Sequence, residues 1–333
     1  MFVLTSYAAA VLFCIVTMLC WGSWANTQKL AGREWRFELF YWDYVFGVFL
    51  LSLAIALTLG SMGDSGRGFF ADVAQADFAN IRSAIIGGVI FNIANILLVA
   101  AIAIAGMSVA FPVGIGIALV LGVLVNYWAS PVGDATMLFL GVGAVVAAIL
   151  LDAAAYRRLP APGRGVTAKG LILSVLCGVL MGFFYRFVAD AMSTEFENLA
   201  PGKLGPYSAV LFFSVGLLLS NLALNLIIMK KPFLGAPVPV SAYFKGNARV
   251  HLIGILGGAI WGVGMTFNII ASGQAGFAIS YGLGQGATMI AALWGVFIWK
   301  EFRTAPKSTG ALLALMFVCY FAGLAMIIAA RVV

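Results

Sequence analysis

Charged residues are scarce in this sequence. Its 19 lysines and arginines and 12 aspartates and glutamates make up 9% of 333 residues, whereas a soluble domain carries about 25%. So few charges do not cover a water-exposed surface of this size, which excludes a soluble globular protein. Because the chain has one histidine, His251, we expect no histidine-ligated haem and no multi-histidine zinc site.

Cysteines are also few, and none belongs to a CxxC pair. All four fall inside apolar runs, where we expect them to pack between helices as free thiols: Cys14, Cys20, Cys177 and Cys319. We therefore expect no metal and no cofactor. The net charge of +7 is interpreted as a signature of membrane topology, not of nucleic-acid binding.

Long apolar segments dominate the sequence, which has 63% hydrophobic residues and a mean hydropathy of +1.07. A bilayer offers no water to backbone amides, so each segment is expected to be a helix. The first five segments are Tyr7–Gln28, Glu38–Gly60, Ile81–Ile104, Ser108–Trp128 and Thr136–Ala155. The second five are Ala168–Ala191, Pro206–Met229, Val250–Ser272, Gly276–Trp299 and Thr309–Ala330. The expected fold is an all-α polytopic bundle of ten transmembrane helices.

The ten helices divide into two sets of five. We expect a first unit over residues 1–155, a short cytoplasmic linker over 156–167 and a second unit over 168–333. The first apolar run lacks a basic stretch before it, so we interpret it as a retained helix and not a cleaved signal peptide. The sequence does not indicate an oligomeric state.

Positive charge is unevenly distributed between the two sides of this bundle. Fourteen of the nineteen lysines and arginines fall in the connections that follow helices 1, 5, 7 and 9. Such residues stay in the cytoplasm. Both termini are therefore expected outside an inner or plasma membrane, and helix 6 enters the bilayer from the face opposite to helix 1. The two halves would be inverted relative to each other.

An internal repeat agrees with this topology. Residues 85–116 aligned on residues 255–286 without a gap share nine identities in 32 positions, and all five glycines of the first segment meet glycines. Lipid-embedded helices also need small contact residues, so glycine abundance by itself is an alternative explanation. Inverted repeats are typical of secondary transporters that alternate between two packings. We expect helices 3, 4, 8 and 9 to line a site near the midplane.

Several motifs resemble a known superfamily. They are Cys20-Trp21-Gly22-Ser23-Trp24-Ala25-Asn26, Tyr41-Trp42-Asp43-Tyr44, Ala94-Asn95-Ile96-Leu97, Gly106-Met107-Ser108-Val109-Ala110-Phe111-Pro112 and Trp299-Lys300-Glu301-Phe302. With ten helices in two sets, the chain resembles the drug/metabolite transporter superfamily. Within it, the chain is similar to the branch of glucose/ribose porters, rhamnose–proton symporters and ureide permeases. Plant ureide permeases carry a long connection with a nucleotide-loop-like motif after helix 5, which the short connection here lacks.

Asp43 is the strongest candidate for ion coupling. It lies about 8 Å inside helix 2, at 1.5 Å per residue, among Phe40, Tyr41, Trp42 and Tyr44. A carboxyl group in apolar surroundings holds a proton more readily than one in water, and its ionised form is costly in a bilayer. Asp43 could therefore exchange the coupling proton. The alternative is an anchoring pair with a basic residue of the preceding connection.

Uncharged polar and aromatic residues supply the candidate substrate site. Carboxamides both donate and accept hydrogen bonds, which suits neutral polar solutes. Tryptophan rings can stack on a sugar or heterocycle. The candidates are Trp21, Trp24, Asn26, Asn92, Asn95, Asn268, Tyr281 and Gln285. Interhelical hydrogen bonds and an interfacial aromatic belt are the respective alternatives.

Two further positions could control access to this site. Arg186 and Asp190 are four residues apart, so we expect an ion pair that acts as an outer gate or that only snorkels to the interface. Tyr281 aligns with Phe111, and each precedes a helix-loosening residue, which makes both plausible gate points.

The expected function is secondary active import of a small neutral polar metabolite such as a sugar, nucleobase or ureide. A proton is the expected coupling ion, with sodium as the alternative. A drug or metabolite exporter of the same superfamily is the competing function. An enzyme is not expected, because the sequence has no HExxH motif and no midplane pair of carboxylates.

Overall fold

A computed structural model describes residues 1–32, 35–159 and 167–332, and this part of the chain is built from helices without a named strand. Ten of its segments are long and apolar enough to cross a membrane. The prediction of an all-α bundle with ten transmembrane helices is confirmed. Most of the expected linker, residues 160–166, lies outside the described residues.

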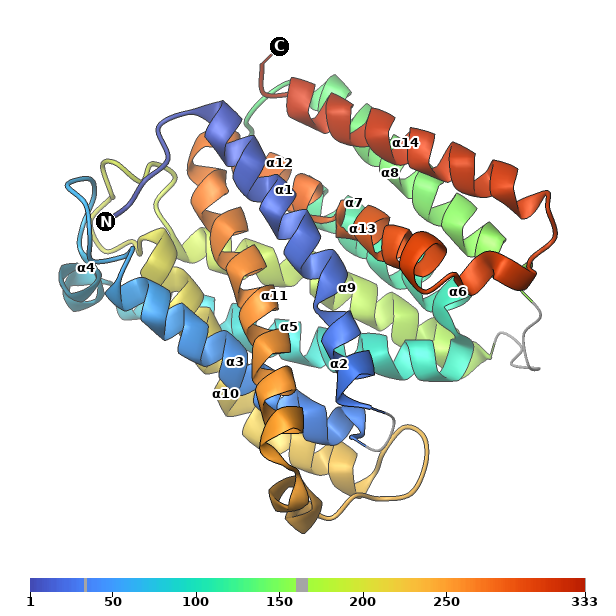
Figure 1. Cartoon of the computed structure of the whole chain (residues 1–333). Coiled ribbons are helices and arrows are strands. Elements are labelled where there is room, and N and C mark those ends of the chain that lie inside the picture. The colour runs from blue at the N-terminus through green and yellow to red at the C-terminus, as the bar shows by residue number, and fades with distance from the viewer. Residues whose placement is uncertain (33–34, 160–166, 333) are drawn as a thin grey trace.

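The helices of the first half follow the expected order. The first span joins α1 and α2, and the fourth joins a short helix and a π-helical turn to α7: α1 Tyr7–Ser23, α2 Ala25–Ala31, α3 Phe37–Leu57, α4 Phe69–Gln75, α5 Phe78–Ala105, α6 Met107–Ala110, η1 Phe111–Ile115, α7 Gly116–Ala129 and α8 Ala135–Tyr156. The short helix α4 covers the end of the bundle at which α3 ends and α5 begins (Figure 1).

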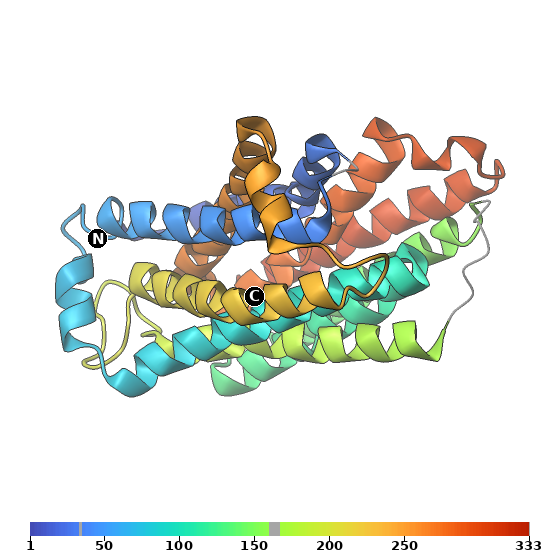
Figure 2. The same cartoon turned by 90° about the horizontal axis from the view of Figure 1, so that it is seen from below.

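The second half repeats the order, with the ninth span broken in two. Its elements are α9 Ala168–Ala191, α10 Pro206–Lys230, η2 Val240–Lys245, α11 Ala248–Ala275, α12 Phe277–Gly284, α13 Ala287–Leu293, η3 Trp294–Ile298, η4 Glu301–Thr304 and α14 Thr309–Ala329. Figures 1 and 2 show α8 and α14 side by side at one edge of the bundle, away from α3 and α10.

Local sequence explains where these helices begin and end. The side chains of Asp134, Thr167 and Asn247 each accept a hydrogen bond from the first turn of the helix that follows. Gly106 and Gly276 end α5 and α11 with φ of +80° and +83°, a conformation that favours glycine. Each is the single residue between two consecutive spans, and the two are 170 positions apart.

Helix pairs in one half have counterparts in the other. The contact of α5 with α9 corresponds to that of α11 with α1, and the contact of α3 with α11 corresponds to that of α10 with α5. Each correspondence exchanges a span with the span five later. The pairs α3 with α10, α8 with α14 and α7 with α12 map onto themselves.

Glycine contacts reproduce this correspondence at atomic detail. A Cβ added to Gly88 would overlap the carbonyl oxygen of Phe213, and one added to Gly258 would overlap the carbonyl oxygen of Tyr44. The two glycines are 170 positions apart, and the two carbonyls 169. The backbones therefore approach closely at two equivalent crossings, as small residues permit in lipid-embedded bundles.

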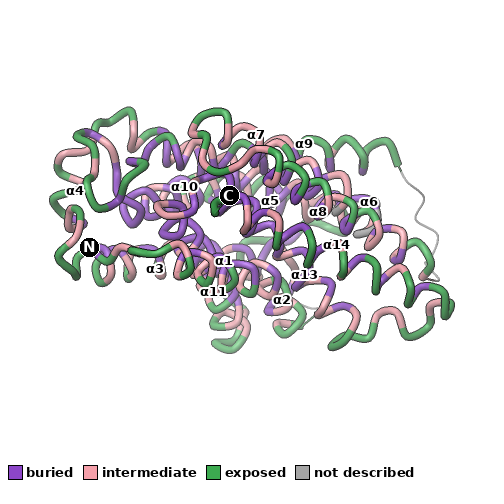
Figure 3. Tube along the Cα trace, turned by 90° about the horizontal axis from the view of Figure 1, so that it is seen from above, coloured by how far each residue is buried: buried purple, intermediate pink, exposed green. Residues whose placement is uncertain are grey.

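Helices α3 and α10 run antiparallel. At one end of the pair, the Asn225 side chain donates to the carbonyl of Glu38 over 2.9 Å. At the other end, Gly60 lies against the ring of Tyr207. Buried residues concentrate in the centre of the bundle and exposed ones on its outside (Figure 3). The exposed residues include many large apolar side chains, as a lipid-facing surface requires.

Candidate functional site

A cavity of about 370 Å³ lies in the middle of the bundle, between α1, α5, α9, α11 and the broken ninth span. Its walls combine aromatic rings, small residues and a few polar groups. The polar and aromatic lining residues are Trp21, Trp24, Gln28, Phe91, Asn95, Phe184, Trp261, Gln285 and Thr288. Among the described residues that line this cavity, none carries a charge.

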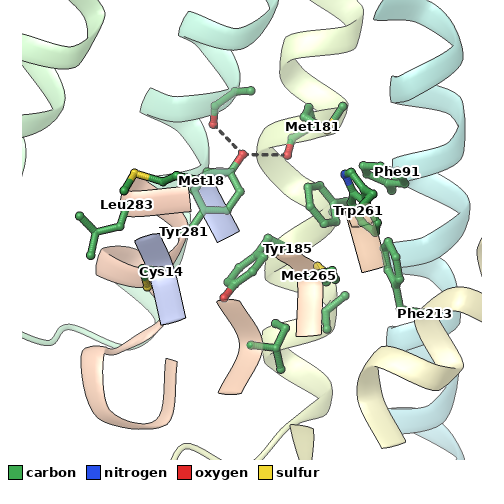
Figure 4. Close-up of a cluster of buried hydrophobic side chains, with 14 of the residues drawn as sticks. Cys14, Met18, Phe91, Met181, Tyr185, Phe213, Trp261, Met265, Tyr281 and Leu283 are labelled. Atoms are coloured by element: carbon green, nitrogen blue, oxygen red, sulfur yellow. Dashed lines mark hydrogen bonds between the residues drawn. The ribbon is translucent and has the colours of Figure 1, made fainter. Parts of the chain in front are cut away.

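Trp261 is the centre of an aromatic cluster in the cavity wall. Its ring stacks on Trp21 with centroids 5.8 Å apart and an interplanar angle of 15°. It also lies 4.4 Å from Phe91 and 5.8 Å from Phe213, as Figure 4 shows for the last two rings. The indole N–H of Trp21 donates to the Trp261 carbonyl over 3.2 Å. Two rings from different helices are thus held in place.

Asn95 lines the cavity, and a chain of hydrogen bonds behind the cavity wall holds its side chain in place. Its Nδ2 donates to the hydroxyl of Tyr41 over 3.1 Å, and that hydroxyl donates to Oδ1 of Asn92 over 2.9 Å. Asn92 then donates to Ser220 over 2.9 Å. Within the described chain, the side-chain oxygen Oδ1 of Asn95 accepts no hydrogen bond. This network fixes the Asn95 side chain and leaves one acceptor for a ligand.

Gln28 and Gln285 supply further amides to the lining. Neither side chain forms a hydrogen bond to another described residue, and Gln285 is 8% exposed. An amide group with no protein partner needs water or a ligand. The cavity therefore presents donors and acceptors, but no fixed charge, next to stacked aromatic rings.

The cavity continues into a vestibule of about 600 Å³ at the end of the bundle where α2 ends. The two spaces share Gly22, Ala25, Gln28, Ile102 and Ala291. The cavity and the vestibule are therefore neighbouring spaces toward this end of the bundle.

Polar and charged side chains surround the mouth of the vestibule. Lys29 lies 3.3 Å from Glu301 and 4.5 Å over the ring of Trp299. Tyr156 donates to Glu301 over 2.8 Å, and Trp299 donates to Asn26 over 2.8 Å. Asn26 thus belongs to this mouth and not to the cavity wall.

Buried tyrosines close the opposite end. The hydroxyl of Tyr281 donates to the carbonyls of Ala118 and Met181 at 3.2 and 3.1 Å, drawn as dashed lines in Figure 4. Tyr185 lies 3.0 Å from the Ser280 hydroxyl and 5.1 Å from the Tyr281 ring. These contacts tie α12 to α7 and α9. The side chain of Phe111 is not among those described.

Removing the Tyr281 hydroxyl is expected to destabilise this closed end. Tyr281→Phe leaves two buried carbonyls with one donor fewer, at a cost of about 1 kcal/mol, and lowers the unfolding temperature of the purified protein. Tyr44→Phe is the matched control, because the Tyr44 hydroxyl is equally buried and has no hydrogen-bond partner among the described residues. Equal unfolding temperatures for the two variants would contradict this assignment.

Asp43 lies outside the cavity, at the junction of α3 and α11. Its Oδ1 accepts a hydrogen bond of 2.5 Å from Tyr243 of η2. Nδ1 of His251 lies 3.0 Å from both of its carboxylate oxygens. Burial and the neighbouring carboxylate raise the pKa of Tyr243 above its usual range. Of the basic residues that the sequence offered as partners of Asp43, Lys29 pairs with Glu301 and Arg36 pairs with Glu38, and Arg33 lies outside the described residues.

Apart from Asn26, Tyr281 and Asp43, the sequence-predicted residues fall into three places. Trp21, Trp24, Asn95 and Gln285 line the cavity. Asn92 and Asn268 lie behind its wall, where the Asn268 side chain donates to the Ser280 carbonyl over 2.7 Å. Arg186 lies 2.9 Å from Asp190 in a partly exposed ion pair at the end of α9.

Sequence reasoning missed the cavity residues Trp261, Phe91 and Gln28. Trp261 aligns with Phe91 in the internal repeat, 170 positions apart. An aromatic residue at the same position of both repeats was the available signal.

A largely apolar cavity with a few uncharged polar groups, inside ten spanning helices and next to a vestibule at one end, fits the architecture of a multi-pass membrane transport protein. Comparison with known families gives the particular one. The family model named ureide permease matches residues 40–161 and 164–330. The chain belongs to the ureide permease family, and the resemblance to that branch in the sequence is confirmed.

Known relatives match most of the length of the chain. Ureide permeases 1 and 4 of Arabidopsis thaliana are 23% and 24% identical, over 99% of this chain and 98% of each relative. A Streptococcus pyogenes serotype M1 protein, whose name assigns it to sugar uptake, is 25% identical over 89% of this chain and 91% of its own length. A crystal structure 17% identical in sequence, with a TM-score of 0.61, covers 98% of this chain and 99% of its own and shares the fold.

Proposed function

We propose that the protein carries a small, uncharged polar solute of the ureide type across the membrane. The observation that supports this most strongly is the lining of the cavity. Three carboxamides and stacked tryptophans surround it, and no charged side chain occurs among its described lining residues. Ureides carry neighbouring N–H and C=O groups on a compact frame. Carboxamides can accept hydrogen bonds from the N–H groups and donate hydrogen bonds to the C=O groups. Sugars, taken up by the streptococcal relative according to its name, are the second class to test.

Alternating access is the proposed mechanism. The equivalent glycine crossings and the antiparallel α3–α10 pair support two inverted halves, residues 1–155 and 168–333. Two halves related in this way allow a second packing, in which the closed and open ends exchange. A solute needs only a few kcal/mol of differential affinity to bias the two states.

The charge distribution supports an assignment of the two faces of the membrane. The vestibule is at the end rich in lysine and arginine, which the positive-inside rule places in the cytoplasm. The described state is then open inward, with both termini outside. The Arg186–Asp190 pair lies at the outer end, where it would act as part of the outer gate.

Import coupled to protons is the proposed direction. A proton gradient directed inward drives accumulation only if a residue binds a proton on one side and releases it on the other. Asp43 is the proposed residue, because its carboxyl group is 2% exposed in a helix that packs against α11, and α11 carries Trp261.

Reconstituted protein tests this function directly. In proteoliposomes with an inward proton gradient, we expect concentrative uptake of allantoin. Equal uptake of glucose or uracil would show that the cavity does not select ureides over other neutral polar solutes. Uptake at equal pH on both sides is expected to stop at equilibrium. Sodium replaces the proton in the scheme if only a sodium gradient drives accumulation. Absence of uptake of every neutral solute, with export of lipophilic cations, would favour the exporter alternative.

A further inference from the structure

Asp43, His251 and Tyr243 form a compact polar cluster that the cavity does not include. Asp43 comes from α3, whereas Tyr243 of η2 and His251 of α11 follow it by 200 and 208 positions in the sequence. Trp35 covers the cluster, with its ring edge-on to His251 at 5.1 Å and 6.2 Å from Tyr243. We propose that this cluster is the proton-binding site of the transport cycle, and that His251 is the group through which the proton passes between water and Asp43.

Exposure assigns the order of the two groups. The Asp43 side chain is 2% exposed, whereas that of His251 is 24% exposed. Imidazole is the side chain that gains and loses a proton near neutral pH. A proton from water therefore reaches His251 first, and its Nδ1 lies 3.0 Å from both carboxylate oxygens of Asp43.

The charge balance explains why the pair suits a moving helix. Neutral imidazole with the Asp43 carboxylate has a charge of −1, and one proton taken from water brings the pair to zero. It is neutral overall whether the proton stays on the imidazole or passes to the carboxyl group. Charge inside a bilayer costs several kcal/mol, so rearrangement of α3 against α11 is easier when the proton is bound.

No other ionisable group replaces either partner in the described surroundings. Glu38, also on α3, is paired with Arg36 over 2.6 Å. Lys245 of η2 and Arg249 of α11 are exposed. The α10 helix contributes Met229, whose sulfur meets the Trp42 indole. Proton binding at this junction thus depends on Asp43, His251 and the hydroxyl of Tyr243.

The equivalent junction in the other half shows that packing does not require these polar groups. By the correspondence of the glycine crossings, Asp43 matches Phe212 and His251 matches Ile81. Both counterparts pack against the hydrophobic core. A polar pair therefore occurs at one of two equivalent helix crossings, which points to chemistry and not to helix packing.

The cluster also has a mechanical connection to the cavity. His251 and Trp261 are ten residues apart on α11, about 15 Å along the helix. The same helix is bonded to α1 through Thr17 and the Gly264 carbonyl over 2.9 Å. Movement of α11 on proton binding therefore displaces one cavity wall.

This inference rests on the proposed transport function, and two assays separate them. Exchange of labelled allantoin at equal pH measures solute movement without a proton gradient, and accumulation under a gradient measures coupling. Asp43→Asn, which carries no charge, is expected to keep exchange within about twofold of wild type, and both Asp43→Asn and His251→Gln are expected to lose at least tenfold in accumulation. Phe212→Leu, at the counterpart position, is the matched control and keeps both.

The outcomes are distinct. Absence of exchange by the wild type counts against the transport function. Exchange by the wild type with full accumulation by His251→Gln overturns the proton site. If His251→Gln loses both activities, Tyr243→Phe is the variant that tests the proton site. Loss of the Tyr243 hydroxyl removes a hydrogen-bond donor that favours the ionised form of Asp43. The pH profile of accumulation is therefore expected to shift to higher pH. An unchanged profile overturns the proposal.

Discussion

Replacing Trp261 with alanine is expected to raise the half-saturating concentration of allantoin about 30-fold or more. The substitution removes the ring that stacks on Trp21 and contacts Phe91. Loss of a buried aromatic surface of this size costs about 2–3 kcal/mol of binding, and each 1.4 kcal/mol corresponds to a factor of about ten. The quantity to measure is the concentration dependence of allantoin exchange in proteoliposomes.

Trp128→Ala provides the control for tryptophan removal. Trp128 is 78% exposed near the end of α7 and does not line the cavity. Its replacement is expected to leave the half-saturating concentration within about twofold of wild type. Equal affinities for Trp261→Ala and wild type would remove the aromatic cluster from the binding site.

The second large effect is expected from a single methyl group. Gly88→Ala and Gly258→Ala each place a Cβ on a backbone carbonyl of a neighbouring helix, Phe213 in the first case and Tyr44 in the second. The backbone must move, because neither contact is the end of a flexible side chain. Overpacking of a well-packed helix pair costs about 3 kcal/mol, so we expect both variants to lose most of their folded yield in detergent.

Gly143→Ala is the matched control, since a Cβ at Gly143 meets no described atom within 4 Å. It is expected to match wild type or to be slightly more stable, because alanine has the higher helix propensity. The measurement is the fraction of monodisperse protein after heating. If Gly88→Ala kept its folded yield and Gly258→Ala lost it, the two helix crossings would not contribute equally to stability.

Much of the fold was predictable because the bilayer simplifies it. Apolar runs define helices directly, and all ten were predicted from the apolar segments of the sequence. Their boundaries shifted where backbone geometry depends on packing. The first span extends to Ala31 through α2 and the fourth is interrupted by the π-helical turn η1, which no hydropathy pattern records.

The candidate site was predictable only in part, because its members are brought together by packing. Asn95 and Gln285 line the cavity, but Asn92 and Asn268 are held behind its wall by hydrogen bonds to Ser220 and to the Ser280 carbonyl. In the sequence, His251 indicated only that a histidine-ligated haem or multi-histidine zinc site is not expected. Its contact with Asp43 joins positions 208 residues apart, and no local pattern predicts such a contact.

Protection of one engineered cysteine tests the central claim that a neutral ureide binds in this cavity. Ala291 lines both the cavity and the vestibule, so Ala291→Cys is placed in a background with Cys14, Cys20, Cys177 and Cys319 replaced by serine or alanine. We expect a membrane-impermeant thiol reagent to label Cys at this position from the cytoplasmic side. Allantoin should slow the labelling with the same concentration dependence as transport. Labelling that allantoin leaves unchanged, at concentrations that saturate transport, would contradict the account.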